Sequence, residues 1–165
     1  MNKRLAGCRR VAVLGVGSEL RGDDAAGVLV VRALRHRVHE APFRRLEFEG
    51  FEGANAPENL TGFISSFKPT HIVVVDAAEI GASAGEYREI AAGEIAETDF
   101  STHTLPLQVI MDYLQQATGA VITLLGIQPA SLGFGERPTP RMESGVRRLS
   151  SQLYEVMTEC DGRLE

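Results

Sequence analysis

The sequence predicts an α/β fold, a three-layer α/β/α sandwich in which helices cover both faces of a twisted, mostly parallel sheet. Two runs of apolar residues without alternation, 11–14 and 71–75, support this prediction. Strands that are buried on both faces of a parallel sheet have this composition. Segments with apolar residues at helical spacing lie between the runs, and strands that alternate with helices favour right-handed crossovers.

The first strand, at 11–14, runs directly into Gly15, Gly17 and a polar turn. The helix expected after this turn carries apolar residues at helical spacing, namely Val28, Val31 and Leu34. Asp23 is our candidate for its N-cap, because an aspartate side chain can accept a hydrogen bond from a free amide of the first turn. The pattern therefore predicts strand, loop and helix in this order.

Two further buried runs end in residues that break the apolar pattern. The run 71–75 ends in Asp76, and the run 121–125 ends in Gly126. We expect both runs to be parallel core strands. The other expected elements are a short helix over 57–67, an edge strand over 86–90, a helix that opens at Pro106 with Thr104 as a candidate cap, and a final helix that opens at 139–140.

Length and charge narrow the class of protein. The 165 residues suit a single domain over 1–165, and the net charge of -5, with both signs mixed along the chain, disfavours a nucleic-acid partner. The chain has no credible signal peptide, and no run approaches the roughly 20 apolar residues of a transmembrane helix. We therefore expect a cytoplasmic protein without membrane insertion. Cys8 and Cys160 match no disulfide or metal spacing, which favours a structural or incidental role.

Three candidate site residues follow from the rule that ligands bind beyond the carboxyl ends of strands in open α/β sheets. Asp76 directly follows the strand at 71–75, and Asp24 lies in the loop after the first strand. His103 precedes another expected helix start. A helix N-terminus favours an ionised Asp24 and a neutral His103, which are the forms that bind metals.

Two carboxylates and one imidazole make a three-ligand set that leaves coordination positions open for substrate or water. These ligand types suit zinc, nickel, manganese or iron and do not distinguish among them. Each residue also has a plain structural interpretation. Asp24 can serve as a helix cap, Asp76 as a loop acid bonded to nearby amides, and His103 as a surface residue.

Other chemistries fit the sequence less well. The pair Gly15 and Gly17 after a buried strand suggests a dinucleotide-binding loop, but the third glycine of that motif falls at Leu20 and the loop is acidic. Ser18 lies in no nucleophile-elbow motif, and neither cysteine has a histidine partner visible in the sequence. We therefore expect no tightly bound organic cofactor and no acyl-enzyme.

Five segments carry a resemblance to a known family: LGVGSELRGDDAAG at 14–27, APENLTG at 56–62, HIVVVDAAEIGASAGE at 71–86, STHTLPL at 101–107 and LGIQPASLGFGE at 125–136. In this order and spacing they resemble the hydrogenase maturation endopeptidases, which trim the C-terminal extension of nickel-iron hydrogenase large-subunit precursors. The later segments are most similar to the subgroup that acts on membrane-bound, hydrogen-evolving hydrogenases. The resemblance covers most of the chain.

The resemblance implies that Asp24, Asp76 and His103 contact a metal. It also implies that the metal is nickel carried by the substrate, the large-subunit precursor, and not a resident cofactor. Ser18 departs from the family, which usually has asparagine there. The acidic or amide residue that the family carries before a glycine aligns with either Glu49 or Glu52, of which Glu52 is a weak site candidate.

Three functional hypotheses follow. The first is a nickel-gated endopeptidase in which water is activated by metal polarisation or by a carboxylate base, Asp24 or Asp76. The second is a nickel-sensing chaperone that binds the precursor without cutting it. The third is a metal-dependent hydrolase of a small substrate. In the first hypothesis Gln128 and Gly126 are expected to line the path of the substrate tail, by analogy of location.

Overall fold

The computed structural model of the protein describes residues 7–91, 93–94 and 106–164. Within these residues, five strands form one sheet in the order β2-β1-β3-β5-β4. The strands are β1 (Arg10–Val16), β2 (Glu47–Ala54), β3 (His71–Ala77), β4 (Tyr87–Ile90) and β5 (Val121–Ile127). The helices are η1 (Gly22–Ala25), α1 (Ala26–Glu40), η2 (Pro57–Leu60), α2 (Thr61–Phe67), α3 (Leu107–Thr118) and α4 (Pro140–Asp161), where η denotes a 3-10 helix.

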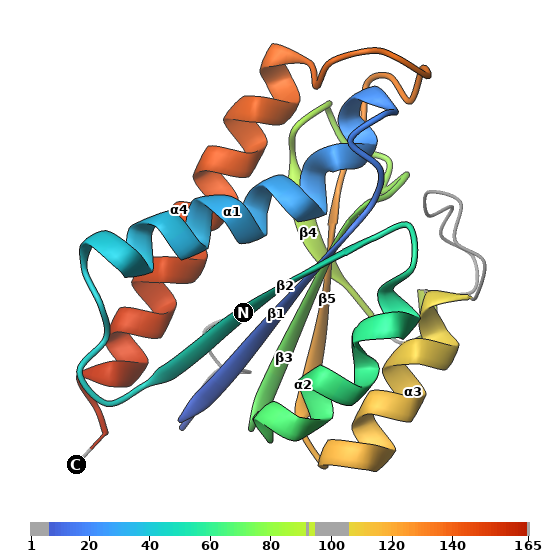
Figure 1. Cartoon of the computed structure of the whole chain (residues 1–165). Coiled ribbons are helices and arrows are strands. Elements are labelled where there is room, and N and C mark those ends of the chain that lie inside the picture. Colours follow the sequence, from blue (N-terminus) through green and yellow to red (C-terminus); the bar gives the residue numbers. More distant parts are fainter. Residues whose placement is uncertain (1–6, 92, 95–105, 165) are drawn as a thin grey trace.

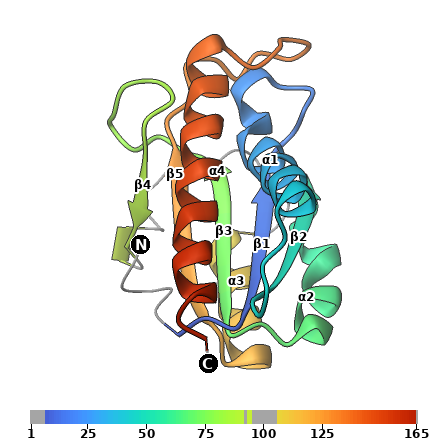
Figure 2. The ribbon, with the colours of Figure 1, turned by 90° about the vertical axis from the view of Figure 1, so that its left-hand side faces the viewer.

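The predicted three-layer sandwich around a mostly parallel sheet is confirmed. β1 pairs in parallel with β2 and β3, and β3 pairs in parallel with β5, whereas β4 is antiparallel to β5 at the edge. α1 and α4 cover one face of the sheet, and α2 and α3 cover the other (Figures 1 and 2). In the part of the chain that the structure describes, no helix is long and apolar enough to cross a bilayer.

Most of the predicted elements lie where the pattern puts them. The predicted strands at 11–14, 71–75 and 121–125 lie within β1, β3 and β5, although Val121 at the start of β5 is exposed. The short helix at 57–67 is formed by η2 and α2, and the edge strand at 86–90 is β4. Pro106 directly precedes α3, but its candidate cap Thr104 lies outside the described residues.

The sequence pattern did not predict β2, the edge strand with the sequence EFEGFEGA. Its glutamates and glycines hide the alternation that would identify a strand, since glycine and glutamate are depleted in strands. Two tight contacts explain the glycines. A Cβ atom at Gly50 would lie 2.8 Å from Val31 Cγ1, and one at Gly53 would lie 2.9 Å from Pro57 Cβ.

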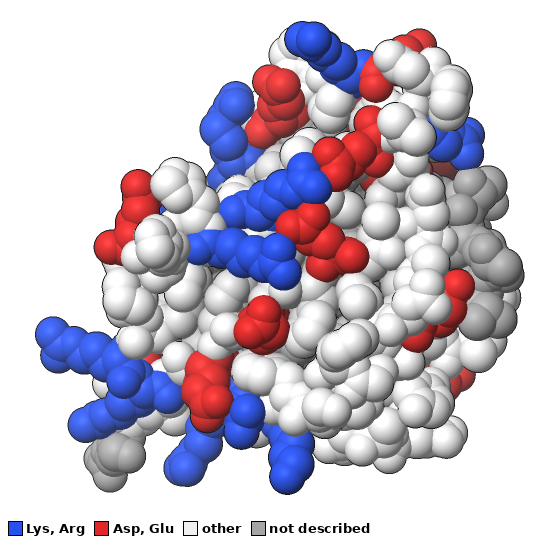
Figure 3. All heavy atoms as spheres, in the orientation of Figure 1, with Lys and Arg blue, Asp and Glu red and all other residues white. Residues whose placement is uncertain are grey.

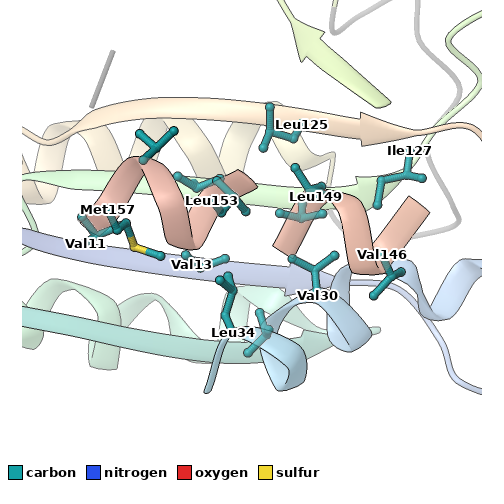
Figure 4. Packing of buried hydrophobic residues seen from close by; sticks show 14 of the residues in the cluster. Val11, Val13, Val30, Leu34, Leu125, Ile127, Val146, Leu149, Leu153 and Met157 are labelled. Atoms are coloured by element: carbon teal, nitrogen blue, oxygen red, sulfur yellow. The ribbon is translucent and has the colours of Figure 1, made fainter. Parts of the chain in front are cut away.

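The core consists of two apolar layers, one on each face of the sheet. On the first face, Val11, Val13 and Leu125 pack against α1 and α4, whose contacting side chains include Leu34 and Leu149 (Figure 4). On the second face the alternate strand residues pack against α2 and α3. Among them are Leu14, Val74 and Leu124, with Ile64, Ile110 and Leu114 from the helices. Successive residues of each central strand thus point to opposite layers.

Both cysteines are buried in the layer formed with α1 and α4, and both are free thiols. Burial, together with a hydrogen bond to the Cys160 thiol, raises the pKa of Cys8 to about 12. Cys8 is therefore protonated at neutral pH, and thiol nucleophilic chemistry is disfavoured there.

The end of α4 is tied to the segment that leads into β2. The Asp161 carboxylate accepts backbone hydrogen bonds from Arg44 (2.9 Å), Arg45 (2.7 Å) and Leu46 (2.7 Å). Burial by itself would raise the pKa of Asp161, but the three backbone donors outweigh it and lower the pKa below its ordinary value. The ionised carboxylate is thus the form that the fold stabilises.

Asp161→Ala should lower the free energy of unfolding by about 1–2 kcal/mol at neutral pH, because three partly solvated amides lose a charged acceptor. A depressed pKa contributes stability above the unfolded value and loses it as the pH falls through the folded value. The difference between wild type and variant should therefore shrink below pH 3.8, the ordinary aspartate value. Urea unfolding at several pH values measures this difference. Asp112→Ala, at an exposed aspartate on α3, is the control, and a pH-independent difference would contradict the assignment.

Candidate active site

The candidate site lies where the carboxyl ends of β1 and β3 meet the start of α1. Glycines allow this approach. A Cβ atom at Gly27, in the first turn of α1, would overlap the Val75 carbonyl oxygen, and one at Gly15 would overlap the Gly27 carbonyl oxygen. The start of α1 therefore packs directly on the backbone of two neighbouring strands, and η1 contacts the end of β3.

Asp24 is held in this corner by the loop that precedes it. Gly17 adopts a φ of +117°, and a Cβ atom there would overlap the Asp24 carbonyl oxygen. The Ser18 backbone N–H donates to Asp24 Oδ2 at 2.9 Å. Asp24 is only 3% exposed, and its Oδ1 atom is buried with no hydrogen-bond partner among the described residues. One oxygen is thus anchored, and the other is available to a ligand.

Asp76 reaches the same edge of the sheet from β3. It is fully buried and stands beside Gly126 in the register of β3 and β5. Because Ile72, Val74 and Ala78 all pack in the layer of α2 and α3, alternation places Asp76 on that face as well. The fold thus brings Asp24 of η1 and Asp76 of β3 to the same edge of the sheet.

The third predicted ligand, His103, lies outside the described residues. Within the described part of the chain, no three His, Cys, Asp or Glu side chains come together as a metal site. The structure therefore describes two members of the predicted trio, Asp24 and Asp76, and their roles as metal ligands stay predictions.

The prediction that Asp23 caps α1 was wrong. α1 begins at Ala26 after Ala25, with no side-chain cap, and Asp23 lies in η1. The fully buried Asp23 carboxylate instead accepts hydrogen bonds from residues more than a hundred positions away. The donors are the Ala130 amide (2.7 Å), the Ser131 amide (3.3 Å), the Thr139 amide (2.6 Å) and the Thr139 hydroxyl (3.0 Å). Local pattern cannot reveal such partners.

Backbone hydrogen bonds reinforce this link between the loop after β1 and the loop after β5. The Asp23 N–H donates to Ser131 O at 2.9 Å, and the Gly22 N–H donates to Glu136 O at 3.2 Å. In the other direction, the Gly135 N–H donates to Leu20 O at 2.7 Å. The loop after β1 and the loop after β5 are therefore joined to each other next to Asp24.

Comparison with known proteins gives the family. A family model described as hydrogenase maturation protease matches residues 28–159. A putative hydrogenase maturation protease of Methanocaldococcus jannaschii is 38% identical over 158 residues, covering 94% of this chain and 93% of the relative. This chain belongs to the hydrogenase maturation protease family. The Hydrogenase 3 maturation protease of Escherichia coli is 35% identical over 142 residues, with 86% of each chain covered.

Solved structures of this family share the fold. The crystal structure of the maturation protease HycI from Thermococcus kodakarensis KOD1 matches with a TM-score of 0.81 at 32% identity, covering 94% of this chain and 97% of that one. The solution structure of the endopeptidase HycI from Escherichia coli matches with a TM-score of 0.73 at 32% identity, covering 88% and 90%. The chain is accordingly a peptide hydrolase of the maturation protease family.

Ser18 departs from the asparagine that the family resemblance led us to expect at this position. The hydrogen bond to Asp24 comes from the Ser18 backbone, so it does not depend on the side chain at this position. The Ser18 hydroxyl instead accepts from the Leu20 N–H at 3.2 Å and shapes the turn. The anchoring of Asp24 therefore does not require an asparagine side chain at this position.

Glu52, the weak site candidate, lies in a surface ion-pair cluster of the maturation protease. Its carboxylate pairs with Arg32 (2.8 Å) and Arg35 (2.7 Å), and Arg32 also binds Glu19 at 2.9 Å (Figure 3 shows acidic and basic side chains next to one another over α1 and β2). The hydrogen bond from Arg32 lowers the pKa of the Glu19 carboxyl. Glu52 thus lies on the face of the sheet that α1 covers, whereas Asp76 lies on the other face.

Glu49, the alternative to Glu52, is exposed and pairs in register with Ala12, well before the end of β1. Gln128, which we expected to line the substrate path, has its amide group engaged within the protein. Its Oε1 atom accepts from the Ile80 and Ala82 amides, and its Nε2 atom donates to Glu79 at 2.6 Å. Gln128 therefore holds the loop after β3 in place.

Asp23→Ala should lower the free energy of unfolding by about 3 kcal/mol or more, because several buried donors lose one charged acceptor. Urea unfolding measures this loss, and hydrogen exchange at the amides of Ala130, Ser131 and Thr139 should become faster. Asp23→Asn, which keeps one acceptor oxygen and the shape of the side chain, is the matched control and should lose less. A change below about 0.5 kcal/mol in Asp23→Ala would show that the link between the loops contributes little.

Proposed function

We propose that this maturation protease removes the C-terminal extension of a nickel-iron hydrogenase large-subunit precursor, and that nickel already inserted in the precursor is the recognition element. The observation that supports this is the Asp24 carboxylate. One oxygen is fixed by the Ser18 amide, while the other is buried without a partner among the described residues. Leaving such an acceptor unsatisfied costs about 1–3 kcal/mol, which a ligand can recover.

The donor set suits a metal carried by the substrate. We assign Asp24, Asp76 and His103 as the residues that contact the nickel, because two carboxylates and an imidazole leave coordination positions for the ligands that the precursor itself supplies. In this proposal nickel is part of the substrate, and the protease needs no resident metal or organic cofactor. Nickel then reports that the precursor is ready for processing.

Hydrolysis of the peptide bond also requires an activated water. Asp24 and Asp76 are the candidate general bases, since both are buried carboxylates at the edge where the substrate would bind. A carboxylate engaged with a metal is a weaker base than a free one. One carboxylate therefore does not coordinate nickel and activate the water at the same time, and in our proposal the base is whichever of Asp24 and Asp76 is not engaged with nickel when the water attacks.

The subgroup, location and domain organisation complete the proposal. We propose the subgroup that acts on membrane-bound, hydrogen-evolving hydrogenases, because the later segments of the chain, up to LGIQPASLGFGE at 125–136, resemble that subgroup most. We propose that the chain works in the cytoplasm as a single peptidase domain over residues 1–165. Its partner is the precursor protein and not a nucleic acid or a membrane.

Incubation with nickel-loaded precursor should shorten the large subunit by a C-terminal peptide, whereas nickel-free precursor should keep its mass. Mass spectrometry of the large subunit measures both reactions. Cleavage of both forms would refute the nickel requirement. An unchanged mass in both, with the precursor still bound, would replace the protease with a non-cleaving chaperone.

Asp24→Asn, Asp76→Asn and His103→Ala should each slow processing by about 100-fold or more, because each loses a charged or coordinating group at the substrate. In Asp24→Asn the oxygen of the new side-chain amide can still accept from the Ser18 N–H, so the fold should persist in that variant. Asp112→Asn, the same change at an exposed aspartate on α3, is the control and should process at the wild-type rate. Circular dichroism checks the folding of each variant. Full activity of folded Asp24→Asn would refute its proposed role.

A further inference from the structure

We propose that Leu20 and Phe134 form an apolar rim that docks the folded body of the precursor protein next to the active site. The two residues lie on different loops that meet at the carboxyl edge of the sheet, where the Gly135 N–H donates to the Leu20 carbonyl oxygen. This inference rests on the proposed function, because it names a surface that the substrate of that function would contact.

Both side chains are largely exposed to solvent. Leu20 is 61% exposed and Phe134 is 81% exposed, the highest value among the large hydrophobic side chains exposed in the described residues. Single exposed leucines are common and need no explanation. An exposed phenylalanine and an exposed leucine on two loops that are hydrogen-bonded to each other, next to a candidate active site, instead indicate an interaction surface.

The loop around Phe134 is built to display this side chain. The Glu136 N–H donates to Gly133 O at 3.3 Å, which closes a four-residue turn with Phe134 and Gly135 at its corners. Gly135 has a φ of +78°, while Phe134 has no positive φ, as in a type II turn. The Ser131 hydroxyl also donates to the Glu136 carboxylate and closes the base of the loop. Phe134 therefore stands at the first corner of an ordered turn.

Leu20 occupies a similar position on the other loop. The Arg21 N–H donates to Ser18 O at 3.2 Å, so Glu19 and Leu20 are the central residues of a turn. The Ser18 hydroxyl accepts from the Leu20 N–H at 3.2 Å. The same Ser18 supplies the backbone N–H that holds the Asp24 carboxylate. A protein seated on Leu20 would thus lie within a few residues of the proposed nickel contact.

The rim is held in place before any partner arrives. The buried Asp23 carboxylate and the backbone hydrogen bonds between the loops fix both turns relative to η1. A surface that is already ordered loses little conformational entropy on binding, so apolar contacts made there contribute more to affinity. Aromatic side chains in such positions are typical binding hot spots.

Three of the charged groups near the rim are engaged within the protein. Glu19 is paired with Arg32, Glu136 accepts from the Ser131 hydroxyl, and Arg21 Nε donates to Leu132 O at 3.4 Å. With these groups engaged within the protein, the rim offers apolar side chains inside a polar border, which is the composition of a protein interface. Continuity with the Asp24 loop selects the precursor as the occupant, because the precursor must bring its cleavage site to that loop.

Phe134→Ala should raise the KM for nickel-loaded precursor about tenfold and leave kcat within about twofold, since truncation of an aromatic hot spot removes binding but not catalytic groups. Leu20→Ala should act in the same direction but less strongly. Phe134→Leu, which keeps an apolar side chain, should restore most of the affinity. Phe63→Ala is the matched control, because Phe63 is 67% exposed on α2 and lies outside both loops. Immobilised precursor, with binding measured by interferometry, gives the Kd without any need for cleavage.

The outcomes separate this inference from the proposed function. If wild-type protein cleaves the precursor and Phe134→Ala shows an unchanged KM and Kd, the rim is refuted and the protease stands. If wild-type protein binds the precursor without cleaving it and Phe134→Ala weakens that binding, the docking role of the rim is supported and the proposed cleavage of the precursor is refuted. A loss of affinity as large in Phe63→Ala, or a rim that mediates contact between two copies of this chain in sedimentation experiments, would also refute the assignment.

Discussion

The candidate site depends on the direct contact between the start of α1 and the backbones of β1 and β3. Side chains at Gly15 or Gly27 would overlap backbone carbonyl oxygens of the opposing segment, so any larger residue would push the helix away from the strands. This contact sets the position of η1 and therefore of Asp24. It also explains Gly15 and Gly27 in the segment 14–27, where the sequence pattern alone also suggested a dinucleotide-binding loop.

Two consecutive aspartates in that segment have different surroundings. The Asp23 carboxylate accepts four hydrogen bonds from the loop after β5 and joins two distant parts of the chain. The Asp24 carboxylate accepts one hydrogen bond from the described residues, and its other oxygen is buried without a partner among them. A buried carboxylate whose oxygens all accept hydrogen bonds stabilises the fold, whereas one with an oxygen left without a donor can bind a ligand there. Asp23 thus joins the two loops, whereas the neighbouring Asp24 is the residue that we propose contacts the substrate.

Other polar residues near this edge support the site from a distance. Gln128 holds the loop after β3 through its side-chain amide, and the cluster of Arg32, Arg35, Glu19 and Glu52 ties the start of the loop after β1 to α1 and β2. Exposed ion pairs of this kind contribute modestly to stability. We therefore assign these ion pairs a role in holding the loop after β1. Both carboxylate oxygens of Glu52 accept hydrogen bonds from arginine side chains, so Glu52 is a poor candidate for a metal ligand.

The sequence by itself determined the α/β class, the three central strands, the helices and the position of Asp24 and Asp76 at strand ends, because hydrophobic periodicity is a local property that burial imposes on each element. It did not reveal β2, whose glycines fit contacts with α1 and η2, nor the true partners of Asp23. These depend on residues that are distant in the chain and meet only when the sheet closes. The tertiary structure alone decided which of two adjacent aspartates is saturated and which keeps an open oxygen, since hydrogen-bond partners across more than a hundred residues leave no local pattern.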